Sequence, residues 1–532
     1  MPPRARDGSS TSATIAERVQ AILDRKELTL YRVSQESSQL YGRSSPYFLP
    51  HNLYYDLRAG LFRPSIHQVA ALSRISGYRV ADWLRLFGFN LEDITRLQVL
   101  LPSKRTIILD TSLTDPNEWI PWFANRPDGS PRTSIAPLVK LLKVIALRRI
   151  GSLDTPGARG YLYAKIGRED ALGFPDLAPG SIVRVNPDIH GRFDLRENTP
   201  VSDHFFLIEH CNGFCCSRIR VLGKGVVMPF DPGLRFAQVE LHCPQEARLL
   251  GVVDLELRPL LYGEEPHVPK DLARYWKPQP LPAHETFGQL LKRTRRSMNL
   301  SVRDAARMSH TVAETLNDDR YTMSPSSLGD YELRNIPPRH FHKIITLCSI
   351  YGLQFESVVK RIGINFADVG TESMPDRYLS HSASGVRGKT APAETVQTGV
   401  IERLMEACHP IPFFLRDSLR YFSSSAPVSL DDFFWVGDNQ DPLHPYLEKG
   451  LLVIVNRRRK TPFHFESKPI WQQPIYVVLK RDGVYLAACC RVENGVLVVH
   501  PYARDFHRDE EYRFHQDAEV VGQIVAIARG LP

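Results

Sequence analysis

One stretch of this chain occurs twice. Residues 167–186 align without a gap on residues 437–456, at a separation of 270 positions. The identities are Gly167/Gly437, Pro175/Pro445, Leu177/Leu447, Gly180/Gly450, Val183/Val453, Val185/Val455 and Asn186/Asn456. The glycines and prolines are the informative matches, because turns need these residues for backbone reasons. Both copies continue into an alternating β-branched segment, which predicts a strand. The sequence therefore predicts a small β unit that is present twice.

A run of short helices is predicted before each β unit. The first begins with the capping-box pattern Thr14-Ile-Ala-Glu17 and contains Tyr55-Asp-Leu-Arg58, which Tyr331-Glu-Leu-Arg334 repeats in the second. Further matches at a separation of 275 are Leu72/Leu347, Ile75/Ile350, Gly77/Gly352, Gly88/Gly363 and Asn90/Asn365. A period near 270 is too long for a solenoid and suits a two-domain protein fused to itself.

The expected fold class is therefore α+β multidomain, in which two all-α domains alternate with two mostly-β domains. The predicted divisions are a disordered tail at 1–13, a helical domain at 14–96, a connector at 97–150, a β domain at 151–258, a linker at 259–284, a helical domain at 285–365, a disordered linker at 366–398 and a β domain at 399–532. The predicted strands of the first β domain are 163–166, 182–185, 205–209, 214–220, 225–229 and 251–257.

The helical segments resemble the Cro/CI-type (XRE) helix-turn-helix domains of phage and bacterial repressors. Five short helices, two close together and a third entered through a tight turn, have this arrangement. The resemblance rests on LTLYRVSQES and ALSRISGYRVADWLRLFG in the first copy, and on TFGQLLKRTRRSMNLSVRDAARMS in the second, which matches better. The turn region of the first copy, Gly42 to Pro50, is longer than usual and contains two prolines.

This resemblance implies binding to double-stranded DNA. The recognition elements would be 45–58 and 324–334, and residues of types that reach base edges or phosphates are Ser45, Tyr47, His51, Asn52, Tyr54, Arg58, Ser326, Ser327 and Arg334. Backbone contacts would come from the basic run of Lys292, Arg293, Arg295 and Arg296. The alternatives stay open: this run could be a solvated helix face, and Arg58 and Arg334 could form internal salt bridges.

The β units resemble the C-terminal, self-cleaving serine peptidase domain of LexA-like and CI-like repressors. That family uses a serine after a motif glycine and a lysine, beside an arginine on a strand, as its base. The resemblance places Glu169 and Asn439 at the serine position, and Ser217 and Cys490 at the lysine position. Both copies therefore lack the dyad, and we expect no autocleavage. The family's β domain also dimerises, so the two copies are expected to pair within the chain.

Composition is consistent with these expectations but does not establish them. The formal net charge of +8 suits a nucleic-acid partner. No run of about 18 uncharged apolar residues predicts a membrane-spanning helix, and the first residues lack the apolar segment of a signal peptide. The cysteines contain no zinc-type pair and are expected to be buried thiols. Cys216 and Cys489, 273 positions apart, are therefore expected to pack in the core rather than to sense redox state.

Two further motifs carry weaker signals. Arg339-His-Phe-His342 contains two histidines that do not share a helix face, so we expect no metal site there. Arg457-Arg-Arg-Lys460 follows a predicted strand and is expected to be a solvated hairpin loop. No cofactor is expected.

The function expected from the sequence is that of a repressor-like, sequence-specific transcription regulator. A single-chain pseudo-dimer would read two unequal half-sites on DNA in a bacterial cytoplasm, at the nucleoid. Pairing of two chains into a homodimer stays open. The alternatives are a protein-interaction or sensor module with degenerate heads, and a self-cleaving peptidase, which lacks its expected dyad.

Overall fold

A computed structural model describes residues 14–59, 64–110, 161–169, 172–173, 176–187, 204–223, 225–230, 239–260, 279–282, 285–364, 369–379, 409–410, 433–436, 447, 451–465, 473–500 and 509–530. The structure combines α-helices with antiparallel β-sheet, as predicted. It divides into two compact units. The helical unit comprises the described parts of Met1–Gln98, Glu285–Arg295 and Leu300–Thr390, and the sheet unit contains the remainder.

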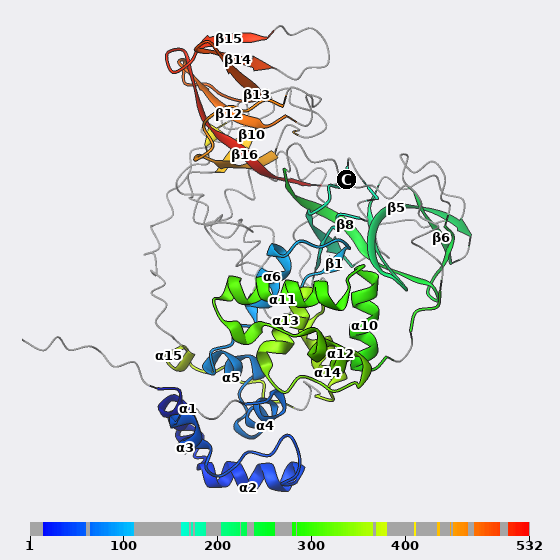
Figure 1. The fold of residues 1–532 in the computed structure, drawn as a ribbon, viewed down its shortest axis with the longest axis vertical. Helices are drawn as coiled ribbons and strands as arrows, with labels where there is room; N and C mark the ends of the chain where they lie inside the picture. The colour runs from blue at the N-terminus through cyan, green and yellow to red at the C-terminus, as the bar shows by residue number, and fades with distance from the viewer. Residues whose placement is uncertain are drawn as a thin grey trace, which may run out of the picture. The chain divides into compact units, whose positions relative to one another are not determined.

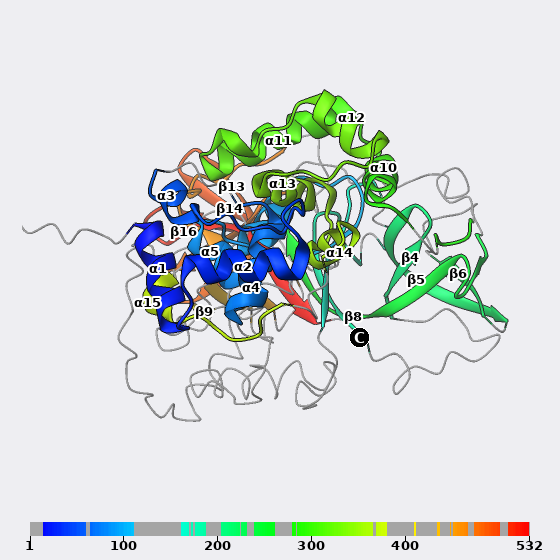
Figure 2. The ribbon, with the colours of Figure 1, turned by 90° about the horizontal axis from the view of Figure 1, so that it is seen from below.

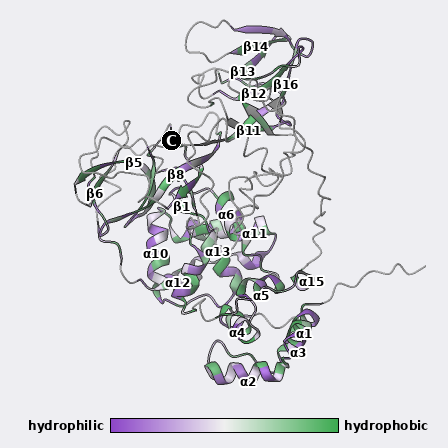
Figure 3. Ribbon diagram, turned by 180° about the vertical axis from the view of Figure 1, so that it is seen from behind, coloured by the Kyte–Doolittle hydropathy of each residue, from purple (hydrophilic) through white to green (hydrophobic). Residues whose placement is uncertain are grey.

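The first group of helices, which we call the first head, begins at the predicted capping box. The Thr14 hydroxyl accepts a hydrogen bond from the Glu17 backbone N–H, and the Glu17 carboxylate accepts one from Thr14. Alternating hydrophobic and hydrophilic colours along α1 and α2 in Figure 3 reflect the single apolar face of each helix. The head comprises α1 (Ile15–Arg25), α2 (Leu30–Tyr41), α3 (Leu53–Arg58), α4 (Ile66–Ser76) and α5 (Val80–Leu86), and α6 (Glu92–Leu100) follows it.

The second head has the same order of helices. Its second helix begins at a capping box formed by Ser301 and Asp304, as the sequence predicts. Its fourth helix is buried along nearly its whole length and ends at Gly352 in the left-handed conformation, as α4 ends at Gly77. The elements are α10 (Phe287–Ser297), α11 (Val302–Leu316), the 3-10 helix η1 (Asp319–Tyr321), α12 (Pro325–Leu333), α13 (Phe341–Tyr351) and α14 (Phe355–Arg361), which form one bundle in Figures 1 and 2.

Neither head has the tight turn expected before its third helix. Residues 42–52 separate α2 from α3, and residues 317–324, including η1, separate α11 from α12. A turn of about 3–4 residues is usual in helix-turn-helix motifs. The longer turn was noted from the sequence only in the first head. In the second, Tyr321 is buried and holds η1 against the bundle, so an apolar anchor keeps the extra residues in place.

The two heads pack together within the helical unit, and they are not the separate domains that the sequence predicted. The Phe89 ring lies edge-on to the rings of Phe341 and His342, with centroids 4.8 and 4.7 Å apart. The buried Gln98 amide on α6 donates to the carbonyl oxygens of Cys348 and Leu353, at 3.0 and 3.1 Å. The predicted boundary at residue 96 is therefore wrong, because α6 continues through it and joins the second head.

The predicted disordered linker at 366–398 is also ordered in part. Residues 369–379, which we call the strap, lie against the first head and contain the short helix α15 (Asp376–Leu379) beside α5 (Figure 1). The sequence suggested disorder because this stretch is poor in apolar residues. The strap instead bonds through its backbone, with a parallel bridge between Tyr78 and Glu372.

The sheet unit repeats one strand arrangement twice. Its first half contains β1 (Ile107–Ile108), β2 (Leu162–Lys165), β3 (Ile182–Asn186), β4 (Phe206–His210), β5 (Gly213–Gly223), β6 (Val226–Phe230), β7 (Leu241–His242) and β8 (Ala247–Pro259). Its second half contains β9 (His409–Pro410), β10 (Phe433–Val436), β11 (Leu451–Asn456), β12 (Ile475–Lys480), β13 (Tyr485–Glu493), β14 (Val496–His500), β15 (Glu510–Arg513) and β16 (Ala518–Gly530). Six of the first-half strands overlap the six predicted ones, and β1 lies in the predicted connector.

The antiparallel pairings of the two halves correspond strand by strand. The first half pairs β1–β2, β2–β3, β3–β8, β8–β4, β4–β5, β5–β6 and β6–β7. The second half pairs β9–β10, β10–β11, β11–β16, β16–β12, β12–β13, β13–β14 and β14–β15.

Irregularities in the sheet correspond as well. The register shifts between Arg184 and Val185 and again between Ile454 and Val455. Three residues before the bulged positions of β8 and β16, a Cβ on Gly251 would lie 2.3 Å from the Asn186 oxygen, and one on Gly522 would lie 2.7 Å from the Asn456 oxygen. Both glycines therefore permit the same close approach of two backbones.

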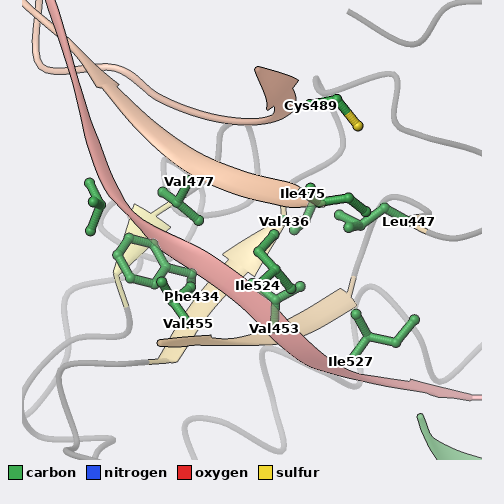
Figure 4. Close-up of a cluster of buried hydrophobic side chains, with 11 residues drawn as sticks. Phe434, Val436, Leu447, Val453, Val455, Ile475, Val477, Cys489, Ile524 and Ile527 are labelled. Atoms are coloured by element: carbon green, nitrogen blue, oxygen red, sulfur yellow. The ribbon is translucent and has the colours of Figure 1, made fainter. Parts of the chain in front are cut away.

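The two halves join through their last strands. β8 pairs antiparallel with β16, and Leu257 lies opposite Ala528. Glu256 lies opposite Arg529 and Arg258 opposite Ile527, one residue to either side. Since Gly251 and Gly522 occupy matching places, Leu257 and Ala528 are counterparts too, and the pairing is approximately symmetric about them. Each half retains its own core, and Figure 4 shows that of the second half, with Phe434, Val453 and Ile524 among its side chains.

No helix in the described part of the chain is both long and apolar enough to span a membrane.

Candidate nucleic-acid interface

The first recognition element places its polar residues at the start of α3. Leu53 is buried and anchors the helix, whereas His51 and Asn52 immediately before it are exposed. Asn52 makes no side-chain capping bond to α3. Tyr54 is half-buried with its ring edge-on to that of Tyr55, and Arg58 is exposed at the end of the helix. His51, Asn52 and Arg58 are therefore exposed to solvent around α3.

Two of the predicted contacts in this head are instead used internally. The Tyr47 ring stacks on Tyr41 with centroids 4.6 Å apart, and its hydroxyl donates to the Gly363 carbonyl in the second head at 3.2 Å. The Ser45 hydroxyl accepts a hydrogen bond from the Tyr47 backbone N–H at 3.3 Å. The structure thus assigns Tyr47 and Ser45 to the packing of the long turn, because the aromatic ring there gains more from stacking than from solvent.

The second recognition element exposes a serine-lined helix start. The Ser324 hydroxyl caps α12 by accepting from the Ser327 N–H at 3.1 Å. The hydroxyls of Ser326 and Ser327 each lie 2.9 Å from that of Ser324. Pro325 occupies the first turn, where its missing N–H costs nothing. Hydroxyls and backbone N–H groups at a helix start can donate to phosphate oxygens.

A buried ion pair fixes the other end of α12. The Arg295 guanidinium on α10 donates to both Glu332 carboxylate oxygens, at 2.7 and 2.8 Å, and only 3% of the Glu332 side chain is exposed. The hydrogen bond to Glu332 raises the pKa of Arg295. Gly288 on α10 donates through its N–H to the Asn335 side chain at 2.8 Å. These contacts hold the C-terminal end of α12 against α10.

The sequence interpretation assigned Arg295 to the DNA-contacting basic run and missed this pair, although a signal was present. Arg295 lies one turn after the buried Leu291 on α10, and Glu332 follows the buried Leu328 by one turn. One charge of each sign on two facing apolar stripes indicates a buried pair, because neither charge is stable in the core alone.

The basic run on α10 is only partly available. Arg293 is paired with Glu285 through two bonds of 2.7 and 3.0 Å, so its predicted role in DNA contact is replaced by a salt bridge. Lys292 is half-buried and Arg296 is exposed. Arg334 pairs with Asp330 at 3.3 Å, yet 70% of its side chain stays exposed, and such surface pairs are weak. Arg303, an exposed residue in the first turn of α11, was not predicted.

The sheet unit provides no serine–lysine dyad in its described part. Glu169 lies in a turn 3.9 Å from the Lys104 amine, and the buried Ser217 hydroxyl donates to the Arg218 carbonyl. Cys490 is buried on β13, where desolvation raises the pKa of its thiol. Asn439 lies outside the described residues. Neither β5 nor β13 contains a lysine.

Strand register corrects the alignment used for the second lysine position. Leu207 and Val477 occupy matching places on β4 and β12, and they lie opposite Cys216 and Ala487. The counterpart of Ser217 is therefore Ala488 rather than Cys490, and the counterpart of Cys216 is Ala487 rather than Cys489. The sequence alignment was wrong because the hairpin before β13 differs in length from that before β5. An alanine cannot act as a base either.

A buried lysine does occur elsewhere in the sheet unit. The Lys165 amine donates to the carbonyl oxygens of Val99 and Leu101, both at 2.7 Å, and burial lowers its pKa to about 8. The buried Ser181 hydroxyl bonds instead to the Glu256 carboxylate at 2.7 Å. Within the described residues, no serine contacts the Lys165 amine, so these groups do not form a nucleophile and base.

The remaining motifs have structural roles. His342 is buried between the rings of Phe89 and Tyr321, and desolvation lowers its pKa to about 4, whereas His340 is exposed. The described residues contain no cluster of three or more metal-ligating side chains. Residues 457–460 are exposed after β11, as expected, but they do not form a hairpin loop, because β11 pairs with β10 and β16 rather than with β12. Cys489 and Cys490 are buried.

In comparisons with known proteins, no family model, no curated protein and no solved structure matches the chain.

Proposed function

We propose that this protein is a sequence-specific, double-stranded DNA-binding transcription regulator of repressor type, built as a single-chain pseudo-dimer. In this proposal a unit comprising one head and one β domain was duplicated, and both copies stayed in one chain. The protein would act at the nucleoid of a bacterial cell. The β domains pair the two copies and perform no catalysis.

The observation that carries this proposal is the approximately symmetric pairing of β8 with β16. A two-fold dimer interface places residue i against the counterpart of residue j, and residue j against the counterpart of residue i. Glu256 and Arg258 pair in this way with Arg529 and Ile527, on either side of Leu257 and Ala528. A dimer of identical chains would form such an interface by association. Joining the copies in one chain replaces that step with an intramolecular one at an effective concentration in the millimolar range.

The exposed residues of the two heads support the DNA-binding part of this proposal. The start of α12, with Ser324, Ser326 and Ser327, is exposed, and the buried pair of Arg295 and Glu332 holds the C-terminal end of this helix against α10. His51, Asn52 and Arg58 present polar groups around α3. These residue types bind phosphates or base edges, and two dissimilar sets fit two unequal half-sites.

Titration of the purified full chain with labelled genomic duplexes at several salt concentrations tests the proposal. Phosphate contacts predict an affinity that falls steeply with salt, and footprinting should show two unequal protected patches. The double variant Arg296→Ala with Arg303→Ala should weaken binding and flatten the salt dependence. The control Arg248→Ala removes an exposed charge from the sheet unit and should leave binding unchanged. Absence of salt-dependent duplex binding would overturn the proposal.

A second candidate function is protein binding through the second head. Leu333 and Ile336, at and just after the end of α12, are 74% and 50% exposed. Exposed apolar side chains beside a recognition element are more typical of a protein interface than of a phosphate-binding surface. In that case Leu333→Ser with Ile336→Ser would abolish binding to the partner protein, and duplex binding would be absent in the parent chain as well.

A further inference from the structure

The strap bonds to the first head through side chains and backbone together. The Lys26 amine contacts the Glu372 carboxylate at 2.6 Å. The Arg79 N–H donates to the Glu372 carbonyl at 2.9 Å, and the Glu372 N–H donates to the Gly77 carbonyl at 3.0 Å. The strap thus forms a single parallel bridge with the turn between α4 and α5. Two backbone hydrogen bonds and an ion pair would have to break before the strap could slide along this turn.

Gly370 brings the strap unusually close to this turn. A Cβ on Gly370 would lie 2.2 Å from the Gly77 carbonyl carbon and 2.5 Å from the Tyr78 oxygen, so only glycine fits. The Gly370 N–H donates to the buried Ser73 hydroxyl at 3.0 Å. Further along, the Met374 N–H donates to the buried Asp82 carboxylate at 2.9 Å, and the Met374 side chain is buried. The strap is therefore anchored at both ends.

The strap follows the second head in the chain and binds the first, so it adds a further connection between the two heads. The Gln98 amide on α6 and the Tyr47 hydroxyl bond directly to the second head. In addition, the ring of Phe89 in the first head packs against the ring of Phe341 in the second. Hydrogen bonds and an apolar contact at several points resist relative motion of the two heads far better than a flexible linker would.

We propose that the strap and the shared contacts make the two heads a single rigid DNA-binding block, whose target is a duplex with two unequal half-sites at one fixed spacing. This inference rests on the proposed function. One inserted base pair shifts a half-site by about 3.4 Å and rotates it by roughly 35°. Flexibly tethered heads would follow that change, whereas a rigid block loses one set of contacts.

The experiment uses the full chain and the duplex recovered by footprinting, with zero, one or two base pairs inserted between the protected patches. For the parent chain, one inserted pair should reduce affinity at least tenfold. The variant Gly370→Val should displace the strap and reduce that penalty to less than threefold. Thr371→Val is the matched control, because Thr371 is exposed in the same segment. Ser73→Ala removes one strap bond without a clash, in case Gly370→Val unfolds the head.

Native-state hydrogen exchange is the readout that does not depend on DNA. Gly370→Val should speed exchange of the Arg79 and Glu372 amides at least tenfold, with the amides of α11 unchanged as evidence of folding. If the parent chain binds duplexes with inserted base pairs as tightly as the original duplex, the fixed spacing is wrong. If amide exchange is unchanged in both strap variants, the strap does not hold the first head rigidly. If the parent chain binds no duplex, the proposed function and the fixed spacing both fail. The hydrogen-exchange rates of the Arg79 and Glu372 amides then still test whether the strap holds the first head rigidly.

Discussion

The two heads share an order of helices but differ in how the third helix is held. In the second head, α12 spans Pro325–Leu333, starts at a serine cap and is tied to α10 by the buried pair of Arg295 and Glu332. In the first, α3 spans only Leu53–Arg58 and has no side-chain cap. The residue of the first head that matches Glu332 in the repeated motif is Asp56, which is only half-buried. The difference teaches that one order of helices can hold its third helix with a buried ion pair and a serine cap in one copy, and with neither in the other.

The largest effect is expected from breaking the buried pair. Glu332→Ala leaves the Arg295 guanidinium without its partner and should destabilise the helical unit by about 3–5 kcal/mol. Asp56→Ala in the first head should cost less than about 0.5 kcal/mol, as expected of a surface change. Urea unfolding followed by helical circular dichroism measures both. Equal losses in the two variants would contradict the difference between the heads.

A pH effect should follow from the histidines at matching positions of α4 and α13. Burial lowers the pKa of His342 to about 4 and also lowers the pKa of His67. A folded-state pKa below the unfolded value near 6.5 means that the neutral form is favoured in the folded head. Its stabilisation is complete above about pH 6.5 and is lost as the pH falls towards 4.

The measurement is unfolding free energy against pH for the parent chain and for His342→Gln. Between pH 6.5 and 4, the unfolding free energy of the parent chain should fall more steeply than that of His342→Gln. His67→Gln should differ from the parent chain in the same direction but by less. A parallel decline in all three chains would show that neither histidine carries the effect.

Two glycines of the second head should respond in opposite directions. A Cβ on Gly288 would lie 2.7 Å from the Tyr331 carbonyl oxygen, so Gly288→Ala should force α10 from α12 at a cost of about 1–3 kcal/mol. Gly329, on α12, has open space around it, and Gly329→Ala should stabilise by about 0.5–1 kcal/mol. Thermal unfolding should separate the two, and the same sign for both would argue against the close packing of α10 on α12.

The smallest effects are expected from single exposed arginines of the DNA-binding proposal. Arg58→Ala in the first head and Arg296→Ala in the second should each weaken duplex binding modestly and reduce the salt slope by about one. Similar changes would show that both heads contact phosphates. A change for Arg296 alone would restrict DNA contact to the second head, and no change for either would count against the proposal.

Much of the local structure followed from the sequence. The capping pairs of Thr14 with Glu17 and Ser301 with Asp304 form as expected, because they depend on residues three positions apart. Strands β2 to β6 and β8 lie where alternation placed them. The site was less predictable: Tyr47 and Arg293 have chemistry that suits DNA, yet their partners, Gly363 and Glu285, satisfy them internally. Residue type states what a side chain can bind, whereas packing decides what it meets.

The sequence by itself determined the repeated order of helices and strands and the absence of a lysine on β5 and β13, since these depend on periodicity and on residue identity. Only the tertiary structure decided that the heads share contacts, that the strap returns to α4 and α5, and that β8 meets β16 about Leu257 and Ala528. Those contacts join residues hundreds of positions apart. They depend on shape and burial at the meeting surfaces, which a linear pattern does not encode.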